Sequence, residues 1–123
     1  MVEIREEKDL RTFLKQEHAA LFFHAPWSQY AVISKQIMEF VESYAKMGKK
    51  EVQFFFGEFE GERVPLAEAI VAAGVPAAVA FTGNGSLSFF RRGQHIHTMS
   101  SVIGEGTFAV WRHIDELLDK HAA

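Results

Sequence analysis

A chain of 123 residues, 48% of them hydrophobic and 24% charged, has the length and composition of one compact domain spanning residues 1–123. The formal charge is −3, and no block of Lys and Arg is longer than two residues, which excludes the basic footprint of a nucleic-acid-binding protein. There is no cysteine, which excludes disulfides, thiolate nucleophiles and thiolate metal sites.

The first residues alternate charged and apolar side chains and lack the apolar stretch of a signal peptide. The longest apolar runs are too short, or too often broken by Gly and Pro, to cross a bilayer. The sequence therefore predicts a cytoplasmic protein with no membrane partner.

The first half of the chain predicts strands and helices in alternation. Apolar and charged residues alternate over 2–5, as in an edge strand, and Asp9 is placed to cap a short helix over 9–16. The continuous apolar run 19–25 predicts a strand covered on both faces. Helical spacing of apolar residues then predicts a long helix over 28–47.

The second half predicts a strand over 52–56 and a short Ala-rich helix over 66–73, followed by strands over 77–82 and 86–91. The Gly-Asn-Gly sequence at 83–85 is typical of a hairpin turn between the last two strands. All five predicted strands therefore precede residue 92.

The C-terminal part begins with a stretch over 94–106 that shows no clear periodicity, so an irregular connection is expected there. Thr107 can cap a final helix. Its predicted buried stripe consists of Phe108, Trp111, Ile114, Leu117 and Leu118.

Three short motifs occur in an informative order. An apolar strand runs into the corner Ala25-Pro26-Trp27, Gly74-Val75-Pro76 precedes a predicted strand, and an Asn-Gly turn follows. In this order and spacing the chain resembles the thioredoxin family over residues 2–120. The resemblance implies an α/β fold, a thioredoxin-like three-layer sandwich in which helices cover both faces of a mixed five-stranded sheet.

The resemblance also shows what is missing. Thioredoxins carry Cys-x-x-Cys at the start of the helix, whereas this chain has Ser28 and Ala31 at those positions. The buried acid of the family corresponds to Phe22. A hydroxyl does not ionise near neutral pH and forms no disulfide, so we expect a redox-inactive protein, not an enzyme, with no cofactor.

The resemblance implies a groove at the same end of the fold. The family holds extended substrate chain beside a cis proline that faces the helix start, and Pro76 is expected to take that role. The expected groove residues are His24, Trp27, Ser28, Gln29, Tyr30, Val75 and Pro76.

Two further interpretations of the helix start remain open besides capping by Ser28. Ser28 or Tyr30 could donate a hydrogen bond to the thiolate of bound glutathione, as in glutathione transferases, which share this fold but carry a second, all-helical domain. His24 and Ser28 could form a nucleophile pair, but the sequence offers no orienting acid or oxyanion hole. A histidine packed beside Trp27 is the plainer interpretation.

Other polar groups fit ordinary surface. His95 and His97 have the spacing of two side chains on one side of an extended segment, and His113 or Glu105 could complete a metal site only if the connection folds back. We predict no metal site. The acidic loop over 57–62 is expected to be solvated.

Phe89, Phe90 and Arg91 form the remaining candidate. Burial beneath the last helix is one interpretation, and an exposed aromatic–arginine interface is the other.

Three functions are therefore carried forward. The first is a non-catalytic module that binds a protein or peptide in the groove, as a chaperone, adaptor or maturation factor. The second is a glutathione-binding or glutathione-transferase-like protein. The third is a structural or homodimeric subunit, so the expected state is a monomer or a weak homodimer.

Overall fold

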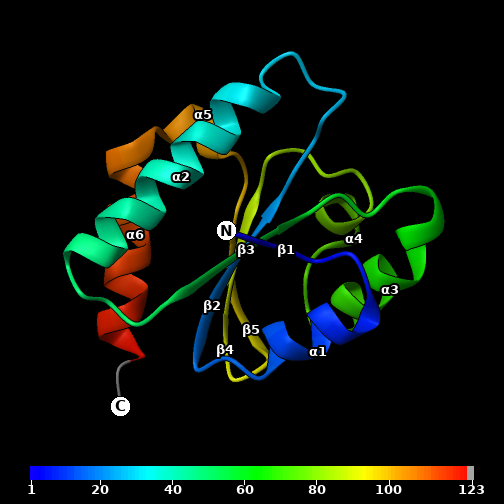
Figure 1. Ribbon diagram of the computed structural model, residues 1–123, viewed down its shortest axis with the longest axis horizontal. Coiled ribbons are helices and arrows are strands. Elements are labelled where there is room, and N and C mark those ends of the chain that lie inside the picture. Colours follow the sequence, from blue (N-terminus) through cyan, green and yellow to red (C-terminus); the bar gives the residue numbers. More distant parts are fainter. Residues whose placement is uncertain (122–123) are drawn as a thin grey trace.

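The computed structural model describes residues 1–121 and contains one mixed sheet of five strands (Figure 1). The strands are β1 (Val2–Glu3), β2 (His18–Phe23), β3 (Gln53–Gly57), β4 (Leu87–Arg91) and β5 (Gln94–Met99). They lie in the order β1-β3-β2-β4-β5. The first three run parallel, β4 is antiparallel to β2, and β5 is antiparallel to β4. The predicted α/β fold class is confirmed.

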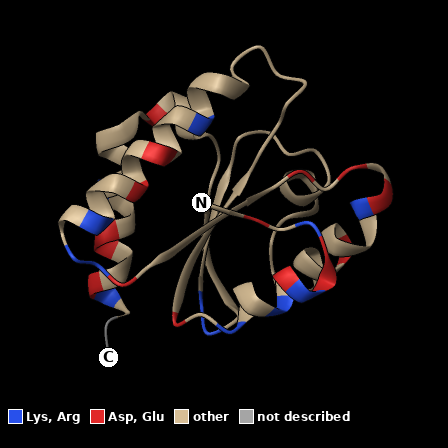
Figure 2. Cartoon of the chain, in the orientation of Figure 1, with Lys and Arg blue, Asp and Glu red and all other residues tan. Residues whose placement is uncertain are grey.

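Helices form a layer on each face of the sheet, as Figure 1 shows. The first layer holds α1 (Glu7–Leu14), α3 (Val64–Ala72) and α4 (Ala77–Ala80), with the 3₁₀ turn η1 (Gly61–Arg63) leading into α3. The second layer holds α2 (Ala31–Met47), α5 (Val102–Glu105) and α6 (Thr107–Lys120). Figure 2 shows that charged residues gather on helices and loops, while the central strands carry very few. Among residues 1–121 no helix is long and apolar enough to span a membrane.

Strand β2 lies at the centre of the sheet, and all six of its residues are buried. Its side chains alternate between the two layers. Leu21 and Phe23 pack with α1 and α3, while Ala20 and Phe22 pack with α2 and α6. The continuous apolar run therefore fills both cores, as the sequence predicts.

Two helices start at other residues than expected. Helix α1 begins at Glu7, because the Asp9 carboxylate accepts hydrogen bonds from the backbone N–H groups of Arg5 and Glu6, at 3.0 Å each, from within the first turn. Helix α2 begins at Ala31, because 25–30 forms a separate turn before it. Ser28 is therefore not the N-cap of α2.

The predicted strand over 77–82 is wrong, because helix α4 begins there. The carbonyl of Pro76 accepts hydrogen bonds from the N–H groups of Val79 (3.0 Å) and Ala80 (3.1 Å), which closes a helical turn. No peptide bond among the described residues is cis, so the prediction of a cis Pro76 is also wrong.

The predicted hairpin turn is displaced as well. The hairpin joins β4 to β5 and turns at Arg92 and Gly93, both with positive φ (50° and 79°). The fifth strand therefore lies within 94–106, where an irregular connection was expected. Residues 83–85 instead lead from α4 into β4.

The buried face of α6 differs in part from the predicted stripe. Ile114 and Leu118 are buried as expected, together with Val110. Phe108 is 71% exposed, because it lies at the start of the helix and stacks on Tyr44 of α2 instead of entering the core (ring centroids 5.5 Å apart).

Candidate functional site

The connection from β2 to α2 forms a tight corner. The backbone N–H of His24 donates to the carbonyl of Gly57 at the end of β3 (2.9 Å). The N–H of Ser28 donates to the carbonyl of Ala25 (2.9 Å), and the Ser28 carbonyl accepts from Ala31 (3.1 Å). Backbone hydrogen bonds thus fix the corner at the carboxyl end of the parallel strands, where α/β folds commonly bind ligands.

A second segment, residues 84–86, faces this corner. The N–H of Gly85 donates to the carbonyl of Phe23 (3.0 Å), and the Ser86 carbonyl accepts from the N–H of Phe23 (2.9 Å). The Gly85 carbonyl accepts from the N–H of Val102 (3.1 Å), which ties the start of α5 to the same place. Gly85 has a φ of +78°, a conformation that favours glycine.

A pocket of about 180 Å³ lies between the corner and this segment. Its wall includes two exposed aromatic residues, Trp27 (62% exposed) and Tyr30 (49% exposed). Three hydroxyl-bearing side chains, Ser28, Ser34 and Ser101, also contribute. The remaining lining residues are Phe22, Ala25, Ala31, Asn84, Gly85 and Ile103.

The positions expected to carry thiols and an acid line this pocket without reactive groups. The Ser28 hydroxyl accepts a hydrogen bond from the N–H of Tyr30 (3.2 Å), so it stabilises the turn before α2. Ala31 is the first residue of α2, and Phe22 is fully buried. No group at these three positions can perform thiol–disulfide exchange.

His24 does not activate Ser28. Burial first, and then the positive charge of Lys35, lower the pKa of His24, which favours the neutral ring. Its ring lies near Phe22 and Phe56, with centroids 6.1 and 6.3 Å away. The Nδ1 atom has no hydrogen-bond partner among the described residues. Among residues 1–121 no hydrogen bond joins the His24 ring to the Ser28 hydroxyl, which is the contact a nucleophile pair requires.

Three of the seven predicted groove residues, Trp27, Ser28 and Tyr30, line the pocket. His24 lies instead on a separate surface hollow with Pro26 and the outer side of α2. Gln29 is outside the pocket lining.

The other two predicted groove residues lie outside the pocket. Val75 is 2% exposed and packs in the core with α3, and Pro76 leads into α4. Asn84 and Gly85, which supply the facing wall, were not among the predicted groove residues. The Gly-Asn-Gly sequence was the available sign that the chain makes a special turn here, but the same sequence predicts a hairpin turn equally well.

The two histidines of β5 lie on opposite faces of the sheet, contrary to the expected spacing. A bulge between Phe89 and Phe90 shifts the register, so that His97 pairs with Phe89 and His95 with Phe90. The His97 ring contacts that of His113 (centroids 4.8 Å apart), and His95 forms a hydrogen bond with Thr98 Oγ1 (2.7 Å). Within residues 1–121, no three His, Cys, Asp or Glu side chains are grouped to hold a metal ion.

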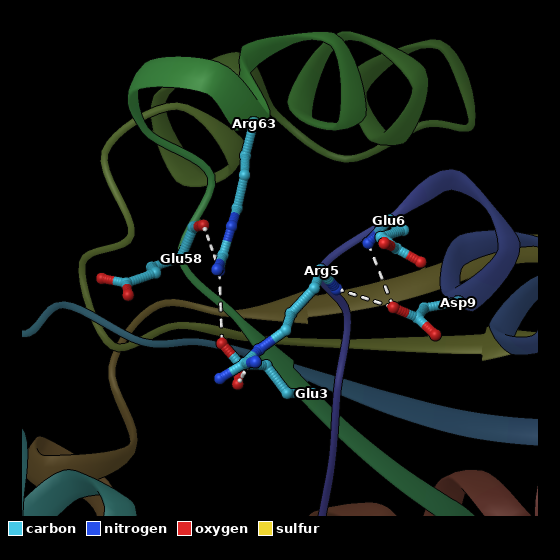
Figure 3. A network of polar contacts seen from close by, with 6 residues as sticks. All are labelled: Glu3, Arg5, Glu6, Asp9, Glu58 and Arg63. Carbon is cyan, nitrogen blue, oxygen red and sulfur yellow. Dashed lines mark hydrogen bonds and ion pairs between the residues drawn. The ribbon is translucent and has the colours of Figure 1, made fainter.

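The acidic loop after β3 is joined to the N-terminal strand, as Figure 3 shows. Arg63 Nη1 donates to Glu3 Oε2 (3.2 Å) and to the Glu58 carbonyl (3.4 Å), while Arg5 Nε donates to Glu3 Oε1 (2.8 Å). Burial opposes ionisation of Glu3, but the hydrogen bonds from Arg5 and Arg63 prevail and lower its pKa. These hydrogen bonds connect β1 to the loop after β3.

The candidate interface at β4 is buried. Phe89 and Phe90 are 2% and 1% exposed and pack into the two cores on opposite faces of the sheet. Arg91 Nε lies 3.8 Å from Glu17 Oε1. The interpretation of these phenylalanines as an exposed interface is therefore wrong, because helices cover both faces of β4.

Known proteins match this chain in three-dimensional structure but not in sequence. No protein-family profile and no curated protein sequence matches this chain. Oxidised thioredoxin from Plasmodium falciparum superimposes with a TM-score of 0.61 and 16% identity, covering 100% of this chain and 99% of that one. Thioredoxin from Trypanosoma brucei brucei gives 0.67 and 11%, covering 97% and 91%. The chain has the thioredoxin fold.

The same fold recurs as part of a longer protein. Human ERp44 superimposes with a TM-score of 0.69 and 16% identity, covering 94% of this chain and 32% of ERp44. Within the thioredoxin fold, the pocket described above lies at the start of α2, where the family resemblance places the two cysteines. Because this chain has no cysteine, it has no nucleophile for thioredoxin-type redox chemistry.

Proposed function

We propose that this protein is a redox-inactive binding module that holds an extended segment of a partner protein in the pocket between the corner and residues 84–86. The observation that carries this proposal is the exposure of Trp27 and Tyr30 beside the pocket. Trp and Tyr, together with Arg, are enriched at the energetic centres of protein interfaces. A protein that binds a partner without catalysing a reaction on it would fit the role of a chaperone, adaptor or maturation factor.

The size of the pocket favours a peptide side chain over a whole cofactor. Its volume of about 180 Å³ is smaller than the roughly 300–1,000 Å³ typical of small-molecule sites. Phe22 and Ala31 give it an apolar wall, and Ser34 and Asn84 add polar groups that could orient a bound chain. One or two apolar side chains of a partner would fit, with Trp27 and Tyr30 covering them.

The test uses peptides selected from a random library on the wild-type protein, with dissociation constants measured by calorimetry. The double variant Trp27→Ala/Tyr30→Ala should bind the selected peptides at least about tenfold more weakly, because it removes both exposed aromatic residues. Phe81→Ala, which removes an exposed aromatic outside the pocket, is the matched control and should bind as wild type. Equal binding by all three proteins would contradict the proposal.

Glutathione is the second candidate ligand, because both hydroxyl-bearing residues proposed to contact it, Ser28 and Tyr30, line the pocket. Titration with millimolar glutathione, followed through the backbone amide signals of residues 28–32 and 84–85, separates the two ligands. Shifts with peptide alone support the peptide-binding module. Saturable shifts with glutathione alone would contradict the peptide-binding proposal and support glutathione as the ligand.

A further inference from the structure

Helix α2 carries an uncharged, largely apolar face that the rest of the fold does not cover. We name as the α2 stripe the exposed residues on this face, which recur at helical spacing: Val32, Ile33, Gln36, Phe40, Ser43 and Met47. Its four apolar members are 49–76% exposed. The opposite face of the helix, which includes Met38 and Val41, packs in the core. An apolar stripe on the solvent side of an amphipathic helix suggests an interface.

The neighbouring helix widens this surface. Phe108 of α6 is 71% exposed and stacks on Tyr44 of α2, with ring planes inclined by 18°. Together with the apolar members of the stripe it exposes on the order of 600 Å² per chain, taking about 200 Å² for a fully exposed large side chain. A standard interface buries roughly 800 Å² per partner, so the surface is large enough to form the centre of one.

Charges along the open edge of the stripe indicate which partner fits. One edge is bordered by α6, and Glu39 and Lys46 follow the other edge, two helical turns apart. Both are exposed, and within residues 1–121 neither forms an ion pair. If two α2 helices pack antiparallel, Glu39 of each copy approaches Lys46 of the other. In a parallel pair the same edge of the two helices lies on opposite sides of the interface, so Glu39 and Lys46 would not face these charges of the other copy.

We propose that the α2 stripe is the interface of a homodimer in which two copies of this chain pack their α2 helices antiparallel about a two-fold axis. Such an interface is self-complementary, since the same patch serves both copies and each charge pair forms twice. With Glu39 opposite Lys46 of the other copy, the axis passes between residues 42 and 43, so Phe40 of each copy lies within one helical turn of it. This interface lies on the solvent side of α2 and goes beyond the proposed peptide site, so either proposal can fail alone.

Sedimentation equilibrium of the full chain, from low micromolar to near-millimolar concentration, tests the dimer. Wild type should follow a monomer–dimer equilibrium, and Phe40→Asp should weaken dimerisation on the order of a hundredfold, because the charge would enter the interface twice. Phe81→Asp introduces the same charge at an exposed phenylalanine outside the stripe and should dimerise as wild type. A wild-type monomer at all concentrations, or a dimer unaffected by Phe40→Asp, would overturn the proposal.

Charge exchange tests the antiparallel orientation. Glu39→Lys and Lys46→Glu should each weaken self-association by roughly tenfold, because both symmetric pairs become repulsive. An equimolar mixture of these two variants should associate as strongly as wild type, since each Lys then faces a Glu. The double variant Glu39→Lys/Lys46→Glu should also regain the wild-type affinity. If neither the mixture nor the double variant recovers, the antiparallel arrangement is wrong. Far-UV circular dichroism of each variant verifies that it is folded.

Discussion

Gly83 positions one wall of the pocket through its backbone. Its φ is +55°, and a Cβ atom placed on it would lie 2.7 Å from the carbonyl oxygen of His24. The close approach lets the segment after α4 cross beside the corner before β4 begins. A side chain at this position would meet backbone, which cannot move aside as a flexible side chain could.

Gly83→Ala should therefore lower the free energy of unfolding by about 1–3 kcal/mol, through the positive φ and the clash with His24. Gly104→Ala is the matched control, because its added Cβ would meet no atom within 4 Å. It should leave the free energy of unfolding unchanged or slightly raised, since alanine favours helix. Urea denaturation measures both, and equal effects of the two substitutions would contradict this role of Gly83.

Phe13 packs helix α1 against the sheet. Phe13 is 1% exposed and makes edge-on contacts with Phe55 (ring centroids 5.2 Å apart) and Phe90 (4.9 Å). It thus joins the first helix to a parallel strand and to an antiparallel strand. Aromatic pairs in this geometry stabilise beyond their buried area.

Phe13→Ala should lower the free energy of unfolding by about 3–5 kcal/mol, because it leaves a cavity between α1 and the sheet. Phe108→Ala removes the same side chain from an exposed position and should cost less than about 1 kcal/mol. Both are measured by urea denaturation at a protein concentration low enough to keep the chain monomeric. Comparable losses would show that Phe13 does not anchor α1.

Three half-buried histidines of the fold favour the neutral form. Burial is the largest cause that lowers the pKa of His24, His95 and His97. A nearby positive charge adds to it at each: Lys35 beside His24, His97 beside His95, and His113 beside His97. His95 and His97 lie on β5, and His24 follows β2, so the titration of these groups affects the free energy of unfolding of the whole domain.

The free energy of unfolding should therefore decrease as the pH falls through the ordinary histidine pKa of 6.5. Below that value the unfolded chain takes up protons that the folded chain still rejects, whereas well above it both are neutral and these histidines contribute no slope. Thermal unfolding from pH 8 to about pH 5.5, at one fixed protein concentration, measures the effect. The carboxylates with lowered pKa values, such as Glu3, affect stability only at lower pH.

His97→Gln should reduce this pH dependence, because it removes one half-buried imidazole and its contact with His113. An unfolding midpoint that stays level across this range in the wild type would contradict the prediction.

The sequence by itself determined the elements whose signals are local. The apolar run of β2 and the periodicity of α2, α3 and α6 are properties of neighbouring residues, and all four elements form close to their predicted positions. The absence of thiols is likewise plain from composition alone. The aromatic side of the pocket, Trp27 and Tyr30, could be predicted because both residues belong to one corner.

Only the tertiary structure decided helix α4, strand β5 and the far wall of the pocket. Strand β5 forms because its backbone pairs with the edge of β4. The sequence of 94–99 has no periodicity that predicts this pairing. The wall at Asn84 and Gly85 is set by hydrogen bonds to Phe23 and Val102, which lie far away in the sequence. Whether Phe40 and Phe108 are buried depends on which helix lies beside them, and that is a contact between distant segments that helical spacing cannot specify.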